Sequence, residues 1–197
     1  AGYSVTVCDV KIEWAQGGID KIAAGLDKLV GKGKMEADAA AKVKGNLKTG
    51  EYKDLSDADL VVEAILETMD AKKGLFSQLD EICKAETIFA TNTSSLSVTE
   101  IAKGIKHDVI GMHFFNPANV MKLVEVICGV NTPAATKDAI VEVSKKLGKT
   151  PVEVNEGPGF VVNRILVPMI NEAAFILQEG IASAEDIDTA MKLGANH

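Results

Sequence analysis

Polar residues that could do acid–base chemistry gather in three short segments in the middle of the chain. These are Asn92-Thr93-Ser94-Ser95-Leu96, His113-Phe114-Phe115-Asn116-Pro117 and Glu125, which together offer a hydroxyl, a carboxamide, an imidazole and a carboxylate. Each segment is expected at the end of a β-strand. Because side chains at the carboxyl ends of strands line the ligand crevice of an open α/β sheet, the cluster predicts an active site for a small molecule.

The same residues also allow a purely structural interpretation. The segment from Asn92 to Ser95 could serve only to cap the next helix. His113 could be an interior histidine whose hydrogen bonds are satisfied. This interpretation suits any one residue taken alone, whereas the cluster as a whole favours chemistry.

Composition sets the class of protein that could carry such a site. The chain has 197 residues and is 47% apolar, which is enough to bury the core of one large or two modest domains. No apolar run approaches the roughly 18 residues of a membrane span, and no secretion signal opens the chain, so we expect a cytoplasmic protein without a membrane partner. The net charge of −7 argues against a nucleic-acid partner.

The cysteines do not indicate a metal site or a disulfide framework. There are three of them, Cys8, Cys83 and Cys128, an odd number with wide spacing in apolar segments. Metal sites need closer and more regular spacing of their ligands. We therefore expect reduced, buried thiols and no bound metal.

The elements that must position the polar cluster alternate between strands and helices. Apolar runs predict strands over 4–8, 59–65, 87–91, 109–115, 123–128 and 151–154, and the spacing of apolar residues predicts helices over 11–31, 36–47, 68–84, 96–105 and 133–146. The continuous run over 59–65 is typical of a strand buried on both faces. This alternation predicts an α/β fold with a Rossmann-type, doubly wound parallel sheet.

The character of the chain changes at Glu156-Gly157-Pro158-Gly159. The segment 160–179 that follows predicts a helix too apolar to lie on the surface of a monomer. Ser183 and Asp186 are spaced to cap a last helix over 184–193. We therefore expect two domains, residues 1–156 and the beginning of an all-helical domain over 157–197.

Asp9 is the first indication of a cofactor. It follows a strand, as does the acid that receives the adenine ribose hydroxyls in a dinucleotide-binding fold, and an acid there repels the 2′-phosphate of NADP. This predicts NAD. The glycine-rich loop that normally precedes such an acid by about 20 residues would lie before residue 1. As an isolated feature, Asp9 could equally be an ordinary turn residue.

Taken together, these segments resemble the 3-hydroxyacyl-CoA dehydrogenase family. The likeness runs over nearly the whole chain, through residues 59–64 (DLVVEA), 92–96 (NTSSL), 112–117 (MHFFNP), 121–126 (MKLVEV), 158–164 (PGFVVNR) and 186–194 (DIDTAMKLG). The resemblance implies NAD-dependent oxidation of a (3S)-3-hydroxyacyl-CoA to the 3-ketoacyl-CoA, or the reverse, with a short acyl chain, in fatty acid or butyrate metabolism. It also implies a homodimer formed through the helical domain.

The resemblance assigns roles to residues of the polar cluster. It implies that His113 is the general base, that Glu125 orients it, and that Ser94 and Asn163 form hydrogen bonds with the substrate oxygen. The remaining matches are cofactor positions, Asp9, Ala64, Glu67, Lys72, Asn92 and Asn116, with Asn116 also supporting the catalytic group. Lys32 matches the region that meets the nucleotide end of coenzyme A, although it could also be a solvated helix end.

Two departures from the family and two alternatives bear on this expectation. The first strand of the family's sheet, with its glycine-rich loop, would precede residue 1, and most of the helical domain would follow His197. We therefore expect unpaired strand edges, weak NAD binding and association if the chain acts alone.

The alternative to an active dehydrogenase is a catalytically silent acyl-CoA or nucleotide-binding fragment. Another member of the wider β-hydroxyacid dehydrogenase group fits less well, because those enzymes generally use a lysine base.

Overall fold

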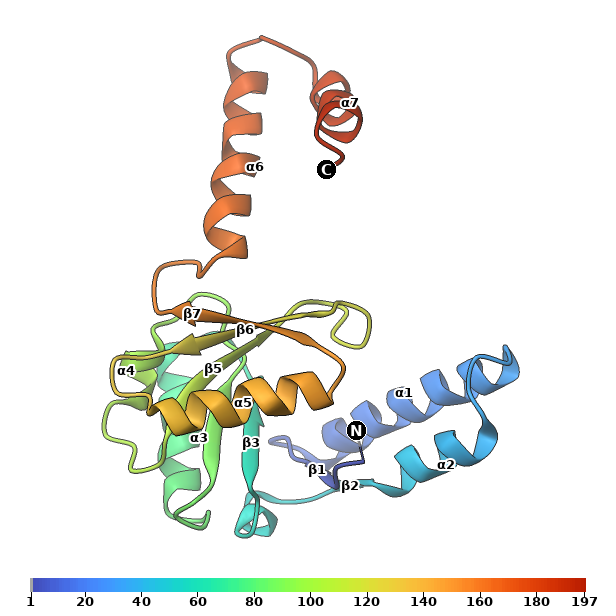
Figure 1. Cartoon of the computed structure of the whole chain (residues 1–197), viewed down its shortest axis with the longest axis vertical. Helices are drawn as coiled ribbons and strands as arrows, with labels where there is room; N and C mark the ends of the chain where they lie inside the picture. The colour runs from blue at the N-terminus through green and yellow to red at the C-terminus, as the bar shows by residue number, and fades with distance from the viewer. Residues whose placement is uncertain (1) are drawn as a thin grey trace.

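The computed structural model describes residues 2–197, so residue 1 of the expected first domain lies outside the described part. Across that part the strands form a larger and a smaller sheet (Figure 1). The larger sheet has the order β3 (Leu60–Glu63), β4 (Ile88–Thr91), β5 (Val109–Phe114), β6 (Leu123–Cys128) and β7 (Thr150–Asn155). The strands expected over 87–91, 109–115, 123–128 and 151–154 are confirmed.

The larger sheet is mixed, which corrects the expectation of an all-parallel sheet. β3, β4 and β5 are parallel, and β6 and β7 are parallel to each other, but β6 runs antiparallel to β5. Only the short segment between Phe114 and Leu123 joins β5 to β6. A parallel connection needs a crossover of a dozen or more residues. The short link between β5 and β6 therefore favours antiparallel pairing.

Helices cover both faces of the larger sheet, as a doubly wound arrangement requires. On one face α3 (Met69–Asp80) and α4 (Val98–Ala102) pack on the sheet through a buried cluster that includes Phe76, Phe89 and Ile101. On the other face α5 (Ala134–Lys146) packs through Ile140 against Ile110 and Val126. Both clusters exclude water on either side of β4, β5 and β6, which fixes the strands that carry the polar cluster.

The smaller sheet belongs to a separate N-terminal unit. β1 (Val5–Val7) pairs in parallel with β2 (Leu47–Thr49), and α1 (Ile12–Gly31) and α2 (Ala37–Gly45) connect them. A short 3-10 helix, η1 (Tyr52–Leu55), then leads to β3. The sequence predicted a helix through residue 47 and missed β2, whose strand conformation depends on pairing with a partner far away in the chain.

The strand β3 corrects a second expectation. It was expected to be buried on both faces, but it is the edge of the larger sheet, and its Val62 is 46% exposed. Neither sheet joins the other, so β1 and β3 each keep one unpaired edge within the described residues. A continuous apolar run therefore indicated the type of element correctly but not its position in the sheet.

The C-terminal segment forms two helices that project beyond the sheets (Figure 1). α6 (Val162–Gln178) confirms the helix expected over 160–179, and α7 (Ala184–Gly194) begins after the expected cap, where Ser183 Oγ accepts a hydrogen bond from Asp186 N at 3.1 Å. Apolar side chains such as Ile165, Val167 and Ile170 are exposed along α6. Among the described helices, none combines the length and the apolar character that crossing a bilayer requires.

Candidate active site

A buried histidine–carboxylate pair lies across the β5–β6 ladder. His113 and Glu125 are directly opposite each other in the antiparallel register, and His113 Nδ1 lies 2.8 Å from Glu125 Oε2. Both side chains are almost completely buried, at 5% and 1% exposed. Glu125 thus lies in the first half of β6 rather than at its carboxyl end, because antiparallel pairing brings the start of β6 to the end of β5.

The second ring nitrogen of His113 is free to react. With Nδ1–H donating to the carboxylate, the neutral ring keeps its lone pair on Nε2. Nε2 has no hydrogen-bond partner among residues 2–197, and no fully buried side-chain nitrogen or oxygen there lacks one, so Nε2 reaches the solvent-accessible surface. The ring also contacts the rings of Phe115 and Phe160, with centroids 4.6 Å and 5.6 Å away. This is the arrangement of an oriented general base rather than of a fully satisfied interior histidine.

Ser94 and Asn163 come together from distant parts of the chain. Asn163 Nδ2, on α6, donates to the backbone carbonyl of Ser94 at 3.4 Å. The capping interpretation of residues 92–95 is wrong, because α4 begins at Val98 and its cap is Ser97, whose Oγ accepts from Glu100 N at 3.1 Å. Asn92 instead fixes the end of β5, since its Oδ1 accepts from Phe114 N at 2.8 Å.

A network of ion pairs and hydrogen bonds, buried at Lys72 and Glu63, supports the loop that carries Ser94. Glu67 Oε1 accepts from Thr93 Oγ1 at 2.5 Å and from Ser94 N at 2.7 Å, which fixes the loop after β4. Lys72 Nζ lies 3.2 Å from Glu67 Oε2 and 2.7 Å from Glu63 Oε1. Burial alone would raise the pKa of Glu67, but hydrogen bonds from Thr93, Ser94 and Lys72 outweigh burial and lower this pKa.

This network changes how two of the expected cofactor residues can act. Lys72 is only 1% exposed and is bonded to two carboxylates, so in this structure its part is to hold Glu67 and Glu63. The sequence interpretation missed Glu63, which is buried in β3 and also accepts from Thr91 Oγ1 at 2.6 Å. The signal was visible as one acid inside an apolar strand, since a charge there needs a partner.

The remaining expected site residues are exposed at the ends of their elements. Asp9 follows β1, and within residues 2–197 only its Oδ1 is bonded, to its neighbour Val10 N at 2.7 Å. Ala64 follows β3 and Asn116 follows β5, both exposed. Lys32 is the exposed C-cap of α1, and none of its hydrogen bonds reaches another site residue.

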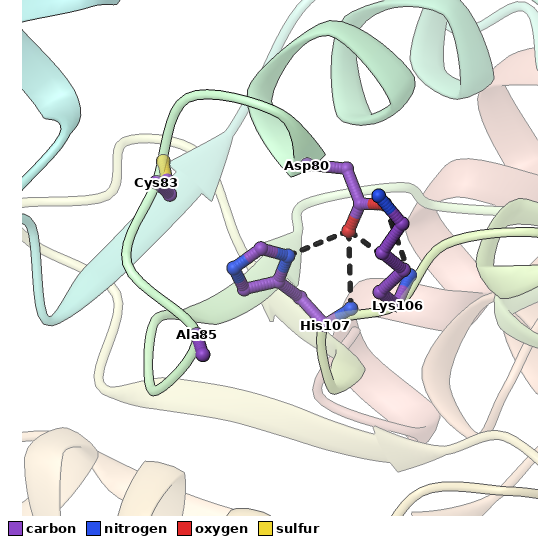
Figure 2. Close-up of a pocket in the computed structure, with 5 residues that line it drawn as sticks. All are labelled: Asp80, Cys83, Ala85, Lys106 and His107. Carbon is purple, nitrogen blue, oxygen red and sulfur yellow. Dashed lines mark hydrogen bonds and ion pairs between the residues drawn. The ribbon is translucent and has the colours of Figure 1, made fainter.

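A second buried histidine pair lies at the opposite end of β5 and was not anticipated. His107 Nδ1 lies 2.6 Å from Asp80 Oδ1, and His107 Nε2 lies 2.9 Å from the carbonyl of Lys84. Figure 2 shows that Asp80 also accepts hydrogen bonds from the backbone N–H groups of Lys106 and His107. A cavity of about 180 Å³ borders this pair. Because both ring nitrogens are bonded, we interpret the pair as a structural connection between α3 and β5.

The fold and the site together define a class of protein. A sheet covered by helices on both faces carries a histidine held by a buried carboxylate at the end of β5, beside a loop held by the Glu67 carboxylate. These features are those of an α/β enzyme domain whose crevice opens at the strand ends. Among residues 2–197, no group of three or more potential ligands could hold a metal ion.

Comparison with known proteins gives the family. Residues 1–157 match the model of the 3-hydroxyacyl-CoA dehydrogenase NAD binding domain, and residues 159–197 match that of the 3-hydroxyacyl-CoA dehydrogenase C-terminal domain. The chain therefore belongs to the 3-hydroxyacyl-CoA dehydrogenase family, a family of oxidoreductases, and most of it is an NAD-binding domain.

Individual relatives agree with this assignment. A 3-hydroxybutyryl-CoA dehydrogenase of Clostridioides difficile is 58% identical over 189 residues, which cover 92% of this chain and 67% of the relative. A probable 3-hydroxybutyryl-CoA dehydrogenase of Bacillus subtilis is 46% identical over all of this chain and 70% of its own length. The crystal structure of (S)-3-hydroxybutyryl-CoA dehydrogenase from Ralstonia eutropha superposes with a TM-score of 0.94 at 44% identity, covering 98% of this chain and 70% of that one.

Proposed function

We propose that the chain interconverts (3S)-3-hydroxyacyl-CoA and 3-ketoacyl-CoA with NAD, acting on short acyl chains such as 3-hydroxybutyryl-CoA and acetoacetyl-CoA. The observation that carries this proposal is the His113–Glu125 pair with its open Nε2, placed within a domain of the 3-hydroxyacyl-CoA dehydrogenase family. The names of the relatives favour the short acyl chain. Fatty acid or butyrate metabolism is the setting that we propose for the reaction.

His113 moves the proton in this proposal. Its Nε2 takes the proton of the substrate 3-hydroxyl, while Nδ1–H stays bonded to Glu125. The adjacent carboxylate stabilises the imidazolium that results, and in the reverse direction the imidazolium returns the proton to the carbonyl oxygen. When bound, NAD supplies the acceptor for the hydride that leaves carbon 3. Proton and hydride together account for both hydrogens removed in the oxidation.

Ser94 and Asn163 are proposed to bind the substrate oxygen. The hydrogen bond from Asn163 Nδ2 to the Ser94 carbonyl brings the start of α6 against the loop after β4, which carries the Ser94 hydroxyl. Both groups can donate hydrogen bonds, and donors directed at an oxygen that gains negative charge stabilise the transition state. Because one donor comes from each domain, the substrate oxygen would be bound where the two domains meet.

The proposed cofactor positions are Asp9, Ala64, Glu67, Lys72, Asn92 and Asn116. Asp9 fits a ribose, because it is exposed and its Oδ2 has no partner among the described residues. Glu67 and Asn92 fix the backbone after β4 and β5, and Lys72 acts through Glu67. We also propose that Lys32 meets the nucleotide end of coenzyme A, for which its exposed charge is suited.

The unpaired edges of β1 and β3 support a further element of the proposal. β1 and β3 each pair in parallel with one neighbour, and they end next to the expected cofactor residues Asp9 and Ala64. A strand running between them would join the two sheets and cover Val62. We propose that the complete NAD-binding sheet contains such a strand, and that the exposed apolar side chains of α6 are buried in a homodimer.

A spectrophotometric assay separates the dehydrogenase from a catalytically silent acyl-CoA or nucleotide-binding fragment. We expect absorbance of reduced nicotinamide to fall when acetoacetyl-CoA is added with NADH. A silent fragment would bind either ligand in titration calorimetry and leave the absorbance unchanged. Binding of both ligands without turnover, in a preparation with the complete chain, would contradict the proposed activity.

A further inference from the structure

Glu125 holds two elements with one carboxylate. Oε2 accepts from His113 Nδ1 at 2.8 Å, and Oε1 accepts the backbone N–H groups of Val161 at 3.1 Å and Val162 at 3.0 Å. These N–H groups are the first of α6, whose own N-cap residue, Val161, offers no side-chain cap. The start of a helix needs acceptors for its free N–H groups, and a carboxylate is favoured there by the helix dipole. The base and the C-terminal segment therefore share one anchor.

The turn before α6 directs these N–H groups towards the sheet. Gly159 has φ 73° and Phe160 has φ 53°, so both residues are in the left-handed region, which a phenylalanine rarely adopts. The turn is tied down by bonds from Phe160 N to Gly157 O and from Arg164 N to Gly159 O, both 3.0 Å. The conformation of Phe160 is thus imposed by its surroundings.

The ring of Phe160 contacts the base itself. It is 5% exposed, belongs to the core beneath β4 and β5, and meets the ring of His113 edge-on with centroids 5.6 Å apart. Edge-on aromatic contacts of this length are favourable and directional. Two contacts therefore orient His113, the hydrogen bond of Nδ1 with Glu125 and the edge-on contact of the ring with Phe160.

We propose that the turn Gly159–Phe160 is a positioning element of the histidine base, and that it couples the placement of α6 to the orientation of His113 through Glu125. This inference rests on the proposed function and extends it to residues that would not touch substrate or cofactor. If α6 moves relative to the sheet, Glu125 loses its hold on Val161 and Val162 and is free to rotate away from His113. A correctly seated C-terminal segment is thereby a condition for an oriented base.

A matched pair of glycine variants in the intact dehydrogenase tests the coupling. At Gly159 a Cβ would lie 2.9 Å from Arg164 N in a left-handed turn, whereas at Gly157 it would lie 3.5 Å from the end of the flexible Arg164 side chain. We expect Gly159→Ala to lower kcat about 10- to 100-fold with little change in KM, as a small misplacement of a catalytic group does. Gly157→Ala should retain the wild-type kcat.

The hydrogen bond can be followed without turnover. The chain has three histidines, so the proton on His113 Nδ1 can be identified in an NMR spectrum by its loss in His113→Gln. We expect this downfield signal to weaken in Gly159→Ala and to persist in Gly157→Ala, with the corresponding proton of His107 unchanged in both. An inactive wild-type protein that shows this pattern would refute the proposed function and leave the positioning role intact.

Two substitutions of Phe160 separate the turn from its ring. Phe160→Gly and Phe160→Val both remove the ring, but glycine accepts the left-handed conformation and β-branched valine resists it. We expect kcat to fall further in Phe160→Val than in Phe160→Gly. Equal kcat values in these two variants, or an unchanged His113 signal in folded Gly159→Ala, would overturn the proposal. If Gly159→Ala does not fold, the comparison of the two Phe160 variants tests the proposal by itself. If the Phe160 variants do not fold, Gly159→Ala tests it by itself.

Discussion

At the scale of single residues, His113 can act as a base through only one ring nitrogen, because Glu125 occupies the other. We therefore expect His113→Gln to lower kcat about 10²- to 10⁴-fold, the usual contribution of a positioned general base. NAD affinity should stay nearly unchanged, since the side chain acts on the substrate proton. Stopped-flow turnover and NAD titration check the two parts. His197→Gln, at an exposed position after α7, is the control, and near-normal turnover of His113→Gln would refute the assignment.

We propose that Asp9 determines the choice between NAD and NADP. Asp9→Ala should weaken NAD binding about tenfold, as expected when a charge-assisted hydrogen bond of about 1.5 kcal/mol is lost. Binding of NADP should weaken less or improve, because repulsion of its 2′-phosphate is removed as well. Fluorescence titration with both nucleotides measures the ratio. Asp188→Ala removes the same charge from α7 and is the control, in which the ratio of NAD to NADP affinity should be unaltered. If this ratio is also unchanged in Asp9→Ala, another residue selects the nucleotide.

At the scale of elements, carboxylates hold the starts of helices and loops against the sheet. Glu125 caps α6, Glu67 fixes the loop after β4, and Glu156 accepts from Thr99 at the start of α4. Burial alone would raise the pKa of Glu156, but hydrogen bonds from Ser97, Thr99 and Val98 outweigh it and lower the pKa. In each case an acid distant in sequence accepts backbone N–H groups of the element and fixes it relative to the sheet, and at α6 it takes the place of a missing side-chain cap.

The Asp80–His107 pair should make the stability of the α3–β5 connection depend on pH. Burial alone would raise the pKa of Asp80, but hydrogen bonds from the His107 ring and from two backbone N–H groups lower it. A carboxyl whose folded-state pKa is lowered contributes stability above its unfolded-state pKa of about 3.9, and the contribution is lost as pH falls through the folded-state value. The pair should therefore stabilise the fold at neutral pH and cease to do so in acid.

Urea unfolding of Asp80→Asn measures this contribution. At pH 7 we expect a loss of about 2 kcal/mol in the free energy of unfolding, typical of hydrogen bonds to a buried charge. The difference from wild type should shrink as the pH falls below 4. Asp57→Asn, at an exposed acid that pairs with Lys84, should change the free energy of unfolding little at either pH. A constant difference across pH would show that the effect of Asp80 is not electrostatic.

At the scale of the whole molecule, the exposed apolar side chains of α6 should determine self-association. Val167, Ile170 and Leu177 are each half exposed or nearly so and lie on one side of the helix by its periodicity. Ile170→Glu should raise the dissociation constant of the proposed dimer roughly tenfold or more, because a charge replaces a buried aliphatic group. Analytical ultracentrifugation measures it.

The control for association lies on the same helix. Gln178→Glu adds the same charge to α6 without removing an apolar side chain, so it should alter the dissociation constant much less. If Ile170→Glu and Gln178→Glu change association equally, net charge rather than the apolar surface is responsible. A wild-type chain that stays monomeric at all concentrations would contradict the proposed dimer.

The sequence by itself determined the elements whose signals are local. Apolar runs placed β4, β5, β6 and β7, apolar spacing placed α1, α5 and α6, and the Ser183 cap placed α7, because strand and helix periodicity and caps depend on neighbours a few residues apart. The polar segments at residues 92–96 and 113–117 also indicated the site, since they follow strands whose ends must meet. The resemblance to the family implied that Glu125 orients His113, and the structure places His113 Nδ1 2.8 Å from Glu125 Oε2.

Only the tertiary structure decided how distant segments meet. It made β6 antiparallel to β5, brought β2 to β1, and left β3 at an edge. It also paired Glu63 with Lys72, Asp80 with His107, and Glu125 with the start of α6. Strand direction and the partner of a buried charge are set by packing between residues far apart in the chain, which no local pattern encodes.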